Sequence, residues 1–162
     1  MTNNTDTILN LLKENARIPT SELAKITGLS ENKIDKILKK LEKDKIILQY
    51  KTIVNENEST SPKIKAIIEL SIQPEHRSGY DKVANRISQH EHISDVYLVS
   101  GEYDYMIVIE GDSIHEISNF VSEIALLGNV TKTSTLFVLK TYKEYGVNFN
   151  TTFQKTRLSI CP

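Results

Sequence analysis

Apolar side chains recur every three or four residues through the first 45 positions, which is the spacing of amphipathic helices. They predict one helix in residues 5–15 and two more within residues 20–45, separated by a turn at residues 28–30. We expect Thr20 and Ser30 to cap the second and third helices with their hydroxyl groups. The predicted apolar positions are Ile8, Leu9, Leu11, Leu12, Leu23, Ala24, Ile26, Ile34, Ile37, Leu38 and Leu41.

The pattern changes after the third helix. Residues 46–54 are rich in β-branched and aromatic side chains and predict a strand that leaves the helical domain. Residues 55–62 are polar and end in Pro62, which indicates a hinge loop. We therefore expect residues 1–54 to form a helix-turn-helix domain with an exiting strand, followed by a linker.

Residues 63–145 alternate between strand-like and helix-like patterns. The order βαββαβ is typical of a four-stranded antiparallel sheet with both helices on one face, the ferredoxin-like arrangement. Ser113 and Glu116 match a capping box and place the start of the second helix. The predicted strands span residues 64–72, 93–100, 105–110 and 130–142, and the predicted helices span residues 80–87 and 113–127.

The sheet face without helices needs a cover of its own. Apolar side chains on that face would otherwise form a large exposed patch, so we expect a homodimer. The tail at residues 146–162 contains Phe149, Phe153 and Leu158 without a firm period. It either adds an edge strand or packs on a partner, and the pattern leaves both open.

The third helix carries a lysine-rich outer face, which favours duplex DNA as a partner because the major groove admits one helix and its phosphates attract cations. Residues 1–55 have a net charge of +3 and residues 56–162 a net charge of −4. This difference is expected if only residues 1–55 bind a polyanion. An ordinary solvated surface helix is the alternative, since Glu31, Asp35, Glu42 and Asp44 offset most of the lysines. The candidate DNA-binding residues are Ser30, Asn32, Lys33, Lys36, Lys39, Lys40 and Lys43.

Composition narrows the classes of protein to which this chain can belong. The 162 residues are 39% hydrophobic and 25% charged, which is ordinary for one medium or two small globular domains. No apolar run is long enough to span a membrane and the start is polar, so we expect a cytoplasmic protein without a membrane partner. The lone Cys161 excludes an internal disulfide framework and a cysteine metal cluster. We expect His76, His90, His92 and His115 to have surface roles, with no metal and no cofactor.

Four segments resemble the Lrp/AsnC family of feast/famine transcription regulators. They are NAR at 15–17, ELAKITGLS at 22–30, KKLEKDKII at 39–47 and LVSGEYDY at 98–105. The resemblance implies an α+β protein in which a winged-type helix-turn-helix domain is joined by a strand and hinge to a ferredoxin-like effector domain. It also implies a sequence-specific DNA-binding regulator without catalytic residues, assembled as dimers and commonly as tetramers or octamers. A small effector such as an amino acid would bind between dimers.

The same resemblance implies an effector site. Gly101, Glu102, Tyr103 and Asp104 match the effector loop of the family, and Thr133 and Thr135 match its polar positions on the last strand. Chemically, an amino acid needs an acceptor such as Asp104 for its ammonium group, with backbone N–H groups and hydroxyl donors for its carboxylate. These polar residues favour a polar ligand. From the residues alone, an ordinary hairpin turn is the favoured interpretation of the GEYD segment, and only the resemblance favours an effector site.

Three positions depart from the family pattern. Asp35 and Ile37 stand where many members have arginine or another polar contact residue, and Lys45 replaces the usual glycine after the recognition helix. Lys45 must therefore adopt a strained left-handed conformation or the helix end must rearrange. Two alternatives stay open. One is an enzyme resembling siroheme decarboxylases, whose histidine and arginine positions have no match here; the other is a partner subunit that does not read DNA.

Overall fold

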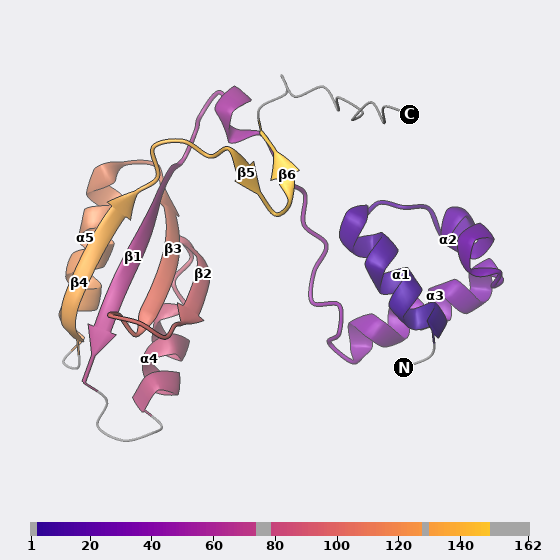
Figure 1. The fold of residues 1–162 in the computed structure, drawn as a ribbon, viewed down its shortest axis with the longest axis horizontal. Helices are drawn as coiled ribbons and strands as arrows, with labels where there is room; N and C mark the ends of the chain where they lie inside the picture. The colour runs from indigo at the N-terminus through magenta and orange to yellow at the C-terminus, as the bar shows by residue number, and fades with distance from the viewer. Residues whose placement is uncertain (1–2, 74–78, 128–129, 150–162) are drawn as a thin grey trace, which may run out of the picture. The chain divides into compact units, whose positions relative to one another are not determined.

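The computed structural model describes residues 3–73, 79–127 and 130–149. The chain divides after Val54 into two compact units, each with its own hydrophobic core (Figure 1). The first unit is helical and the second contains the sheet. Each unit is described by itself below.

The first unit contains the three predicted helices, α1 (Asn3–Glu14), α2 (Thr20–Thr27) and α3 (Glu31–Lys43). Each helix contributes one fully buried side chain to a shared core, namely Ile8, Leu23 and Ile34. Leu41 is also buried, and Ile37 and Leu38 pack against the core. Ile26, predicted to lie on the apolar side of α2, is 52% exposed. This prediction is wrong because the short α2 turns Leu23 and Ala24 toward the core and leaves Ile26 outside it.

The turn between α2 and α3 depends on Gly28. Its φ of +70° lies in the left-handed region, and its N–H donates to the carbonyl of Ala24 to close the end of α2. Both predicted side-chain caps are wrong. Thr20 is already inside α2, which Pro19 precedes with an extended backbone, and Ser30 precedes α3 without a side-chain hydrogen bond to the first turn.

The end of α3 adopts a Schellman motif around Lys45, which is the first of the two outcomes left open by the departure from the usual glycine. The N–H of Lys45 donates to the Glu42 carbonyl, and the N–H of Ile46 donates to the Leu41 carbonyl. Lys45 has a φ of +54°, so a residue with a Cβ occupies the left-handed position. The helix end is thus closed at a conformational cost that glycine would not carry.

Residues 46–54 form no strand within the part of the first unit that the structure describes. This contradicts the predicted exiting strand. A strand needs a neighbour to pair its backbone groups, and the described residues of the helical unit contain no other strand. The segment lies open to solvent instead, with Leu48 83% exposed and Ile46, Tyr50 and Val54 also exposed. The β-branched and aromatic side chains of residues 46–54 are therefore largely exposed in the single chain.

The second unit contains the predicted βαββαβ order and a small additional hairpin. Its four-stranded antiparallel sheet has the order β2-β3-β1-β4, and both α4 and α5 pack on one face (Figure 1). The elements are a short 3₁₀ turn (Glu56–Glu58), β1 (Ile64–Ile72), α4 (Gly79–Ile87), β2 (Ile93–Leu98), β3 (Tyr105–Gly111), α5 (Ile114–Ala125), β4 (Val130–Phe137), β5 (Lys143–Glu144) and β6 (Val147–Asn148).

Alternation along the central strands separates the two faces. Ala66, Ile68, Leu70 and Ile72 of β1 are buried under the helices, while the residues between them lie on the helix-free face. The capping box at the start of α5 is confirmed: the Ser113 hydroxyl accepts a hydrogen bond from the Glu116 N–H. The Glu116 side chain in turn accepts a hydrogen bond from the Asp112 N–H at 2.7 Å. In a capping box this bond comes from the N–H of the N-cap residue, which here is Ser113, one residue later.

The described end of the chain differs from the predicted last strand, which the sequence pattern predicts to reach residue 142. The last strand of the sheet ends at Phe137 rather than near residue 142, and β5 and β6 pair with each other instead of extending the sheet. Tyr145 and Gly146 both have positive φ, as a two-residue hairpin turn requires. Phe149 is buried after β6, whereas Phe153 and Leu158 lie outside the described residues.

Candidate DNA-binding face and effector site

The candidate DNA-binding face is the exposed side of α3. At 3.6 residues per turn, Asn32 and the five lysines of α3 fall within about 120° of the helix circumference. The opposite side carries the buried Ile34 and Leu41. All seven predicted residues are exposed or half-buried at the surface, namely Ser30, Asn32, Lys33, Lys36, Lys39, Lys40 and Lys43. The structure thus brings them together on one surface.

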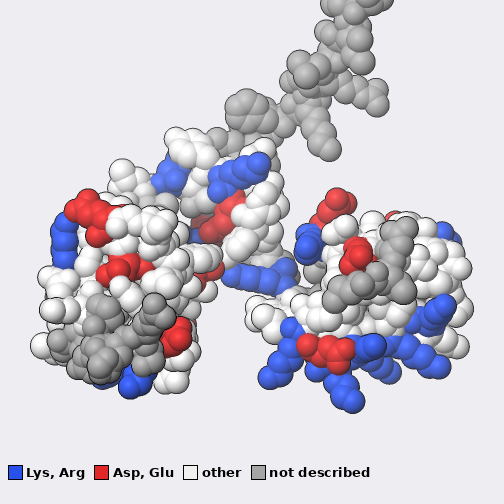
Figure 2. All heavy atoms as spheres, turned by 60° about the horizontal axis from the view of Figure 1, so that its bottom comes forward, with Lys and Arg blue, Asp and Glu red and all other residues white. Residues whose placement is uncertain are grey.

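The charge on this unit is concentrated rather than dispersed. Figure 2 shows Lys and Arg side chains gathered along one side of the helical unit, interrupted by a small acidic group. Ser30 makes no side-chain cap bond, so its hydroxyl remains available beside the lysines. Asp35 is exposed on α3 as well, whereas Ile37 is half-buried and packs against the core.

The predicted effector residues at 101–104 form the turn between β2 and β3. Asp104 fastens this turn to the end of β1: its N–H donates to the Leu70 carbonyl at 2.9 Å, and its Oδ2 accepts from the Ile72 N–H at 2.8 Å. Its other oxygen, Oδ1, accepts from the Tyr80 hydroxyl at 3.3 Å. Both carboxylate oxygens of Asp104 therefore already have partners within the chain.

Tyr80 and Tyr105 connect the same turn to α4. The Tyr105 hydroxyl donates to the Tyr80 carbonyl at 2.7 Å. Burial, and then the neighbouring Asp104 carboxylate, raise the pKa of Tyr105 to about 12. Burial and Asp104 also raise the pKa of Tyr80. Both hydroxyl groups therefore keep their protons at neutral pH and remain hydrogen-bond donors.

Glu102 and Tyr103 meet a residue that the sequence did not single out. Lys132, on β4, lies 2.5 Å from Glu102 Oε1 through its Nζ atom and 4.7 Å above the centroid of the Tyr103 ring. The hydrogen bond to Lys132 lowers the pKa of Glu102, and the bond to Glu102 raises the pKa of Lys132. Both groups are charged at neutral pH. No local pattern indicates this pair, because 30 residues separate its members.

Thr133 and Thr135 lie on the other face of the sheet from Lys132. They pair with Leu70 and Ile68 in the sheet register, so their side chains face the helix side with those buried residues. Lys132 pairs with Ser71 and faces the opposite side. The structure thus joins Glu102 of the turn to Lys132, whose side chain lies on the opposite sheet face from those of the two threonines.

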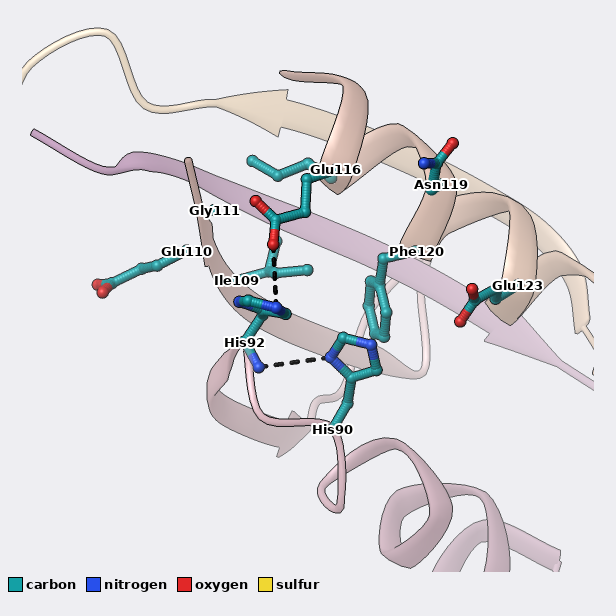
Figure 3. Close-up of a pocket in the computed structure, with 10 residues that line it drawn as sticks. His90, His92, Ile109, Glu110, Gly111, Glu116, Asn119, Phe120 and Glu123 are labelled. Atoms are coloured by element: carbon teal, nitrogen blue, oxygen red, sulfur yellow. Dashed lines mark hydrogen bonds and ion pairs between the residues drawn. The ribbon is translucent and has the colours of Figure 1, made fainter. Parts of the chain in front are cut away.

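A pocket lies between α5 and the segment before β2 (Figure 3). Its volume is about 160 Å³. The Nε2 atom of His92 lies 2.9 Å from Glu116 Oε1, and the His90 ring contacts the Phe120 ring in a tilted arrangement, with centroids 4.3 Å apart and an interplanar angle of 57°. The lining residues are His90, His92, Ile109, Glu110, Gly111, Glu116, Ile117, Asn119, Phe120 and Glu123.

The two histidines of this pocket are half-buried at the surface. They stand two positions apart in the sequence, a spacing that could have drawn attention to them. Within the described residues, no three His, Cys, Asp or Glu side chains converge as a metal site requires. His115 is exposed as predicted, and His76 lies outside the described residues.

Comparisons with known proteins address both units. Residues 65–147 match the family model of the Lrp/AsnC ligand binding domain, and residues 3–47 match that of a winged helix-turn-helix DNA-binding domain. This chain belongs to the Lrp/AsnC family. It is therefore a DNA-binding transcriptional regulator with an effector-binding domain, and the predicted α+β organisation is confirmed.

Several relatives of this Lrp/AsnC protein are named as regulators. It is 35% identical over 157 residues to the uncharacterized HTH-type transcriptional regulator YugG of Bacillus subtilis, covering 96% of this chain and 95% of the relative. It is 32% identical over 137 residues to the HTH-type transcriptional regulator FL11 of Pyrococcus abyssi, covering 85% of this chain and 88% of that protein. The relatives are thus regulators, which does not support the enzyme alternative.

Solved structures share the fold. The crystal structure of PH0061 has a TM-score of 0.74 and 23% identity, covering 89% of this chain and 96% of that one. The complex of the regulator NMB0573 from Neisseria meningitidis with L-Met has a TM-score of 0.69 and 24% identity, covering 93% of this chain and 97% of that one.

In the described part of the chain, no helix is long and apolar enough to cross a membrane.

Proposed function

We propose that this Lrp/AsnC regulator reads specific DNA sequences through α3, while an amino acid bound near residues 101–104 changes its assembly. Residues 1–54 would contact duplex DNA in the cytoplasm, residues 55–62 would act as a hinge, and residues 63–145 would hold the effector and the assembly surface. The observation that carries the DNA contact is the exposed lysine face of α3 opposite its buried stripe.

A two-fold dimer is part of this proposal. It would place two α3 helices about 34 Å apart, one turn of DNA, and so favour a palindromic site. The exposed apolar side chains of residues 46–54 and the helix-free sheet face provide surfaces that a second copy can cover. Further assembly into tetramers or octamers would bring effector turns of different dimers together.

Charge reversal tests the DNA contact. In gel-shift titrations with the full chain, Lys39→Glu combined with Lys40→Glu should weaken binding to every duplex. The slope of log affinity against log salt should fall by about 0.9 for each phosphate that the variant no longer neutralises. Lys82→Glu, an exposed lysine of α4, is the matched control and should leave both quantities unchanged. Equal affinity and slope for the double variant and the wild type would reject α3 as the DNA contact.

The wild-type titration also tests the partner-subunit alternative. Binding to a selected duplex with a Kd at least about tenfold below that for random DNA supports a sequence-reading regulator. If the wild type binds no duplex while DNA-free protein partners co-purify with it, the partner-subunit function replaces the proposal.

The effector part rests on the Lrp/AsnC ligand binding domain and on the polar group around Glu102, Tyr103 and Lys132. A related structure, NMB0573, is described as a complex with L-Met, which is a property of that protein. The test is a thermal-shift screen of the twenty amino acids at millimolar concentration. A ligand at 100 times its Kd should stabilise the folded state by about 2.7 kcal/mol. If none stabilises the wild type, the amino-acid effector is rejected.

A further inference from the structure

The β5–β6 hairpin is too short to keep its position by itself. Each of its strands has two residues, and an isolated two-stranded hairpin is marginally stable in water. The segment that connects it to β4 buries little, since Leu139 is 97% exposed and Tyr142 is 61% exposed. Phe149 is buried directly after β6, and its N–H donates to the Tyr142 carbonyl at 3.0 Å. The hairpin therefore depends on further contacts with the rest of the domain.

Lys65 of β1 provides such a contact. Its Nζ atom lies 2.5 Å from Glu144 Oε1 of the hairpin and 3.0 Å from Glu110 Oε1 of β3. The three side chains are between 21% and 38% exposed, so water screens this group less than a typical surface ion pair. Burial by itself lowers the pKa of Lys65, but the hydrogen bonds to Glu144 and Glu110 outweigh burial and raise the pKa. Lys65 is therefore charged at neutral pH and joins the hairpin to two strands of the sheet.

The charges make Lys65 the residue on which this group depends. Two carboxylates contact one ammonium group, so the carboxylates lie close to each other. Without Lys65, Glu110 and Glu144 would repel each other, whereas loss of either glutamate leaves an ordinary ion pair. Substitution of Lys65 should therefore detach the hairpin more than substitution of either partner.

The hinge and the hairpin line one pocket of about 190 Å³ within the second unit. The hinge contributes Glu56 and Pro62, near its two ends, and the other side contributes Glu144, Phe149 and Lys65. Figure 1 shows the 3₁₀ turn of the hinge beside β6. The hinge therefore lies against the part of the domain whose position depends on Lys65.

We propose that Lys65, through the β5–β6 hairpin, holds residues 55–62 on the effector domain and so restricts which spacing of two DNA half-sites the dimer binds. The hinge connects each helix-turn-helix domain to its effector domain, so a held hinge limits the positions that the helix-turn-helix domain can reach. A flexible connection covers more distances but lowers the effective concentration of the second DNA-binding domain at its half-site. Lys65 acts here as a positioning residue, and the inference rests on the proposed two-fold dimer.

Hydrogen exchange of the full chain without DNA, followed by mass spectrometry, tests the contact itself. In Lys65→Met, the hydrogen-bonded amides of the hinge and the hairpin, such as those of Glu58 and Phe149, should exchange about tenfold faster or more, because this region opens more often. Lys143→Met is the matched control, since it removes the same charge from an exposed position of β5. Its exchange rates should equal those of the wild type.

A series of duplexes tests the effect on DNA recognition. The half-sites of the selected palindromic site are kept at their distance or moved apart by about half a turn of DNA, roughly 5 bp. This change should weaken binding of the wild type and of Lys143→Met by about tenfold or more, and binding of Lys65→Met by at most about threefold. At the selected distance Lys65→Met should bind less tightly than the wild type. Affinity for a single half-site should be equal, because α3 is unchanged.

Further variants separate positioning from a loss of fold. Lys65→Arg keeps the charge and should keep the wild-type exchange rates and spacing preference. Lys65→Glu should be at least as defective as Lys65→Met, because it places three carboxylates together. Adding Glu144→Lys to Lys65→Glu places one ammonium group between two carboxylates again and should restore both properties. Unfolding curves of all variants should show that the sheet remains folded.

Three results would contradict the inference at different steps. Wild-type exchange rates of the hinge amides in Lys65→Met would show that Lys65 does not hold the hinge. Faster exchange with an unchanged spacing preference would show that the held hinge does not restrict DNA recognition. If the wild type itself prefers no spacing, the proposed two-fold dimer fails and the control of spacing fails with it, whereas the exchange rates still decide whether Lys65 holds the hinge.

Discussion

At the scale of single residues, Lys45 shows that local sequence can predict strain. Glycine is common just after a helix because it adopts positive φ without a Cβ clash. The sequence places lysine there, and the structure keeps the left-handed conformation at φ +54° with both Schellman hydrogen bonds. The backbone bonds that close α3 therefore outweigh the preference of one side chain.

Lys45→Gly should stabilise the helical unit by about 1 kcal/mol, because the Cβ strain disappears while the hydrogen bonds remain. Denaturant unfolding followed by circular dichroism measures the change. Asp44→Gly is the matched control: Asp44 has an ordinary φ of −78°, so glycine there should destabilise the unit by about 0.5–1 kcal/mol. A loss of stability in Lys45→Gly would show that Lys45 contributes contacts that outweigh its strain.

Asp104 shows what local sequence leaves out. From its residues alone, the GEYD segment favours an ordinary turn, and the family resemblance makes Asp104 a candidate acceptor for a ligand. The partners of Asp104, the Ile72 N–H and the Tyr80 hydroxyl, lie 32 and 24 residues away. Hydrogen bonds over such separations depend on the sheet register and on the position of α4, which no local pattern encodes.

Asp104→Ala should lower the free energy of unfolding of the second unit by about 1–2 kcal/mol, since it leaves the Ile72 N–H unpaired. If Asp104 only positions the turn, the Kd ratio between an amino acid and its 2-hydroxy acid, which lacks the ammonium group, should stay close to the wild-type ratio. Thermal melts and isothermal titration measure the two quantities. Unchanged stability together with a Kd ratio near one would make Asp104 a ligand contact instead.

At the scale of elements, helices are predictable from the sequence and the strand expected at residues 46–54 is not. Each helix closes its own hydrogen bonds, and the apolar spacing that buries Ile8, Leu23 and Ile34 is visible in the sequence. A strand depends on a neighbour. The sheet of the second unit can be predicted because its four strands and two helices follow in an order with few arrangements.

Within α3, the two ends of the exposed face should have different roles. Asn32 and Lys33 lie in the first turn, the part of a recognition helix that commonly reaches base edges, while Lys39 and Lys40 lie farther along. Asn32→Ala should therefore change the preferred sequence more than the affinity for random duplex. Selection from a random duplex pool, followed by sequencing, measures this. An identical preferred site in the variant would place base recognition elsewhere.

At the scale of the whole molecule, the helix-free sheet face carries charged as well as apolar side chains, whereas the sequence predicted an apolar face. Ile67 of β1 pairs with Val108 of β3 and Leu136 of β4, which gives an apolar band across the sheet. Glu69, two positions along β1, lies beside Met106 and Ser134 in the same register. The band can associate with a second copy, and the charges around it limit which arrangement is allowed.

Ile67→Asp should therefore convert a dimer into a monomer without unfolding the chain. Ile67 lies at the centre of the band, and a carboxylate there would be buried without a partner in a face-to-face dimer, which is strongly unfavourable. Light scattering after size-exclusion chromatography at micromolar concentration measures the mass. Leu126→Asp is the matched control, because Leu126 is 84% exposed just after α5, away from this face. A wild-type monomer would reject the dimer, and a dimeric Ile67→Asp variant would move the interface to residues 46–54, where Leu48→Asp would then disrupt it.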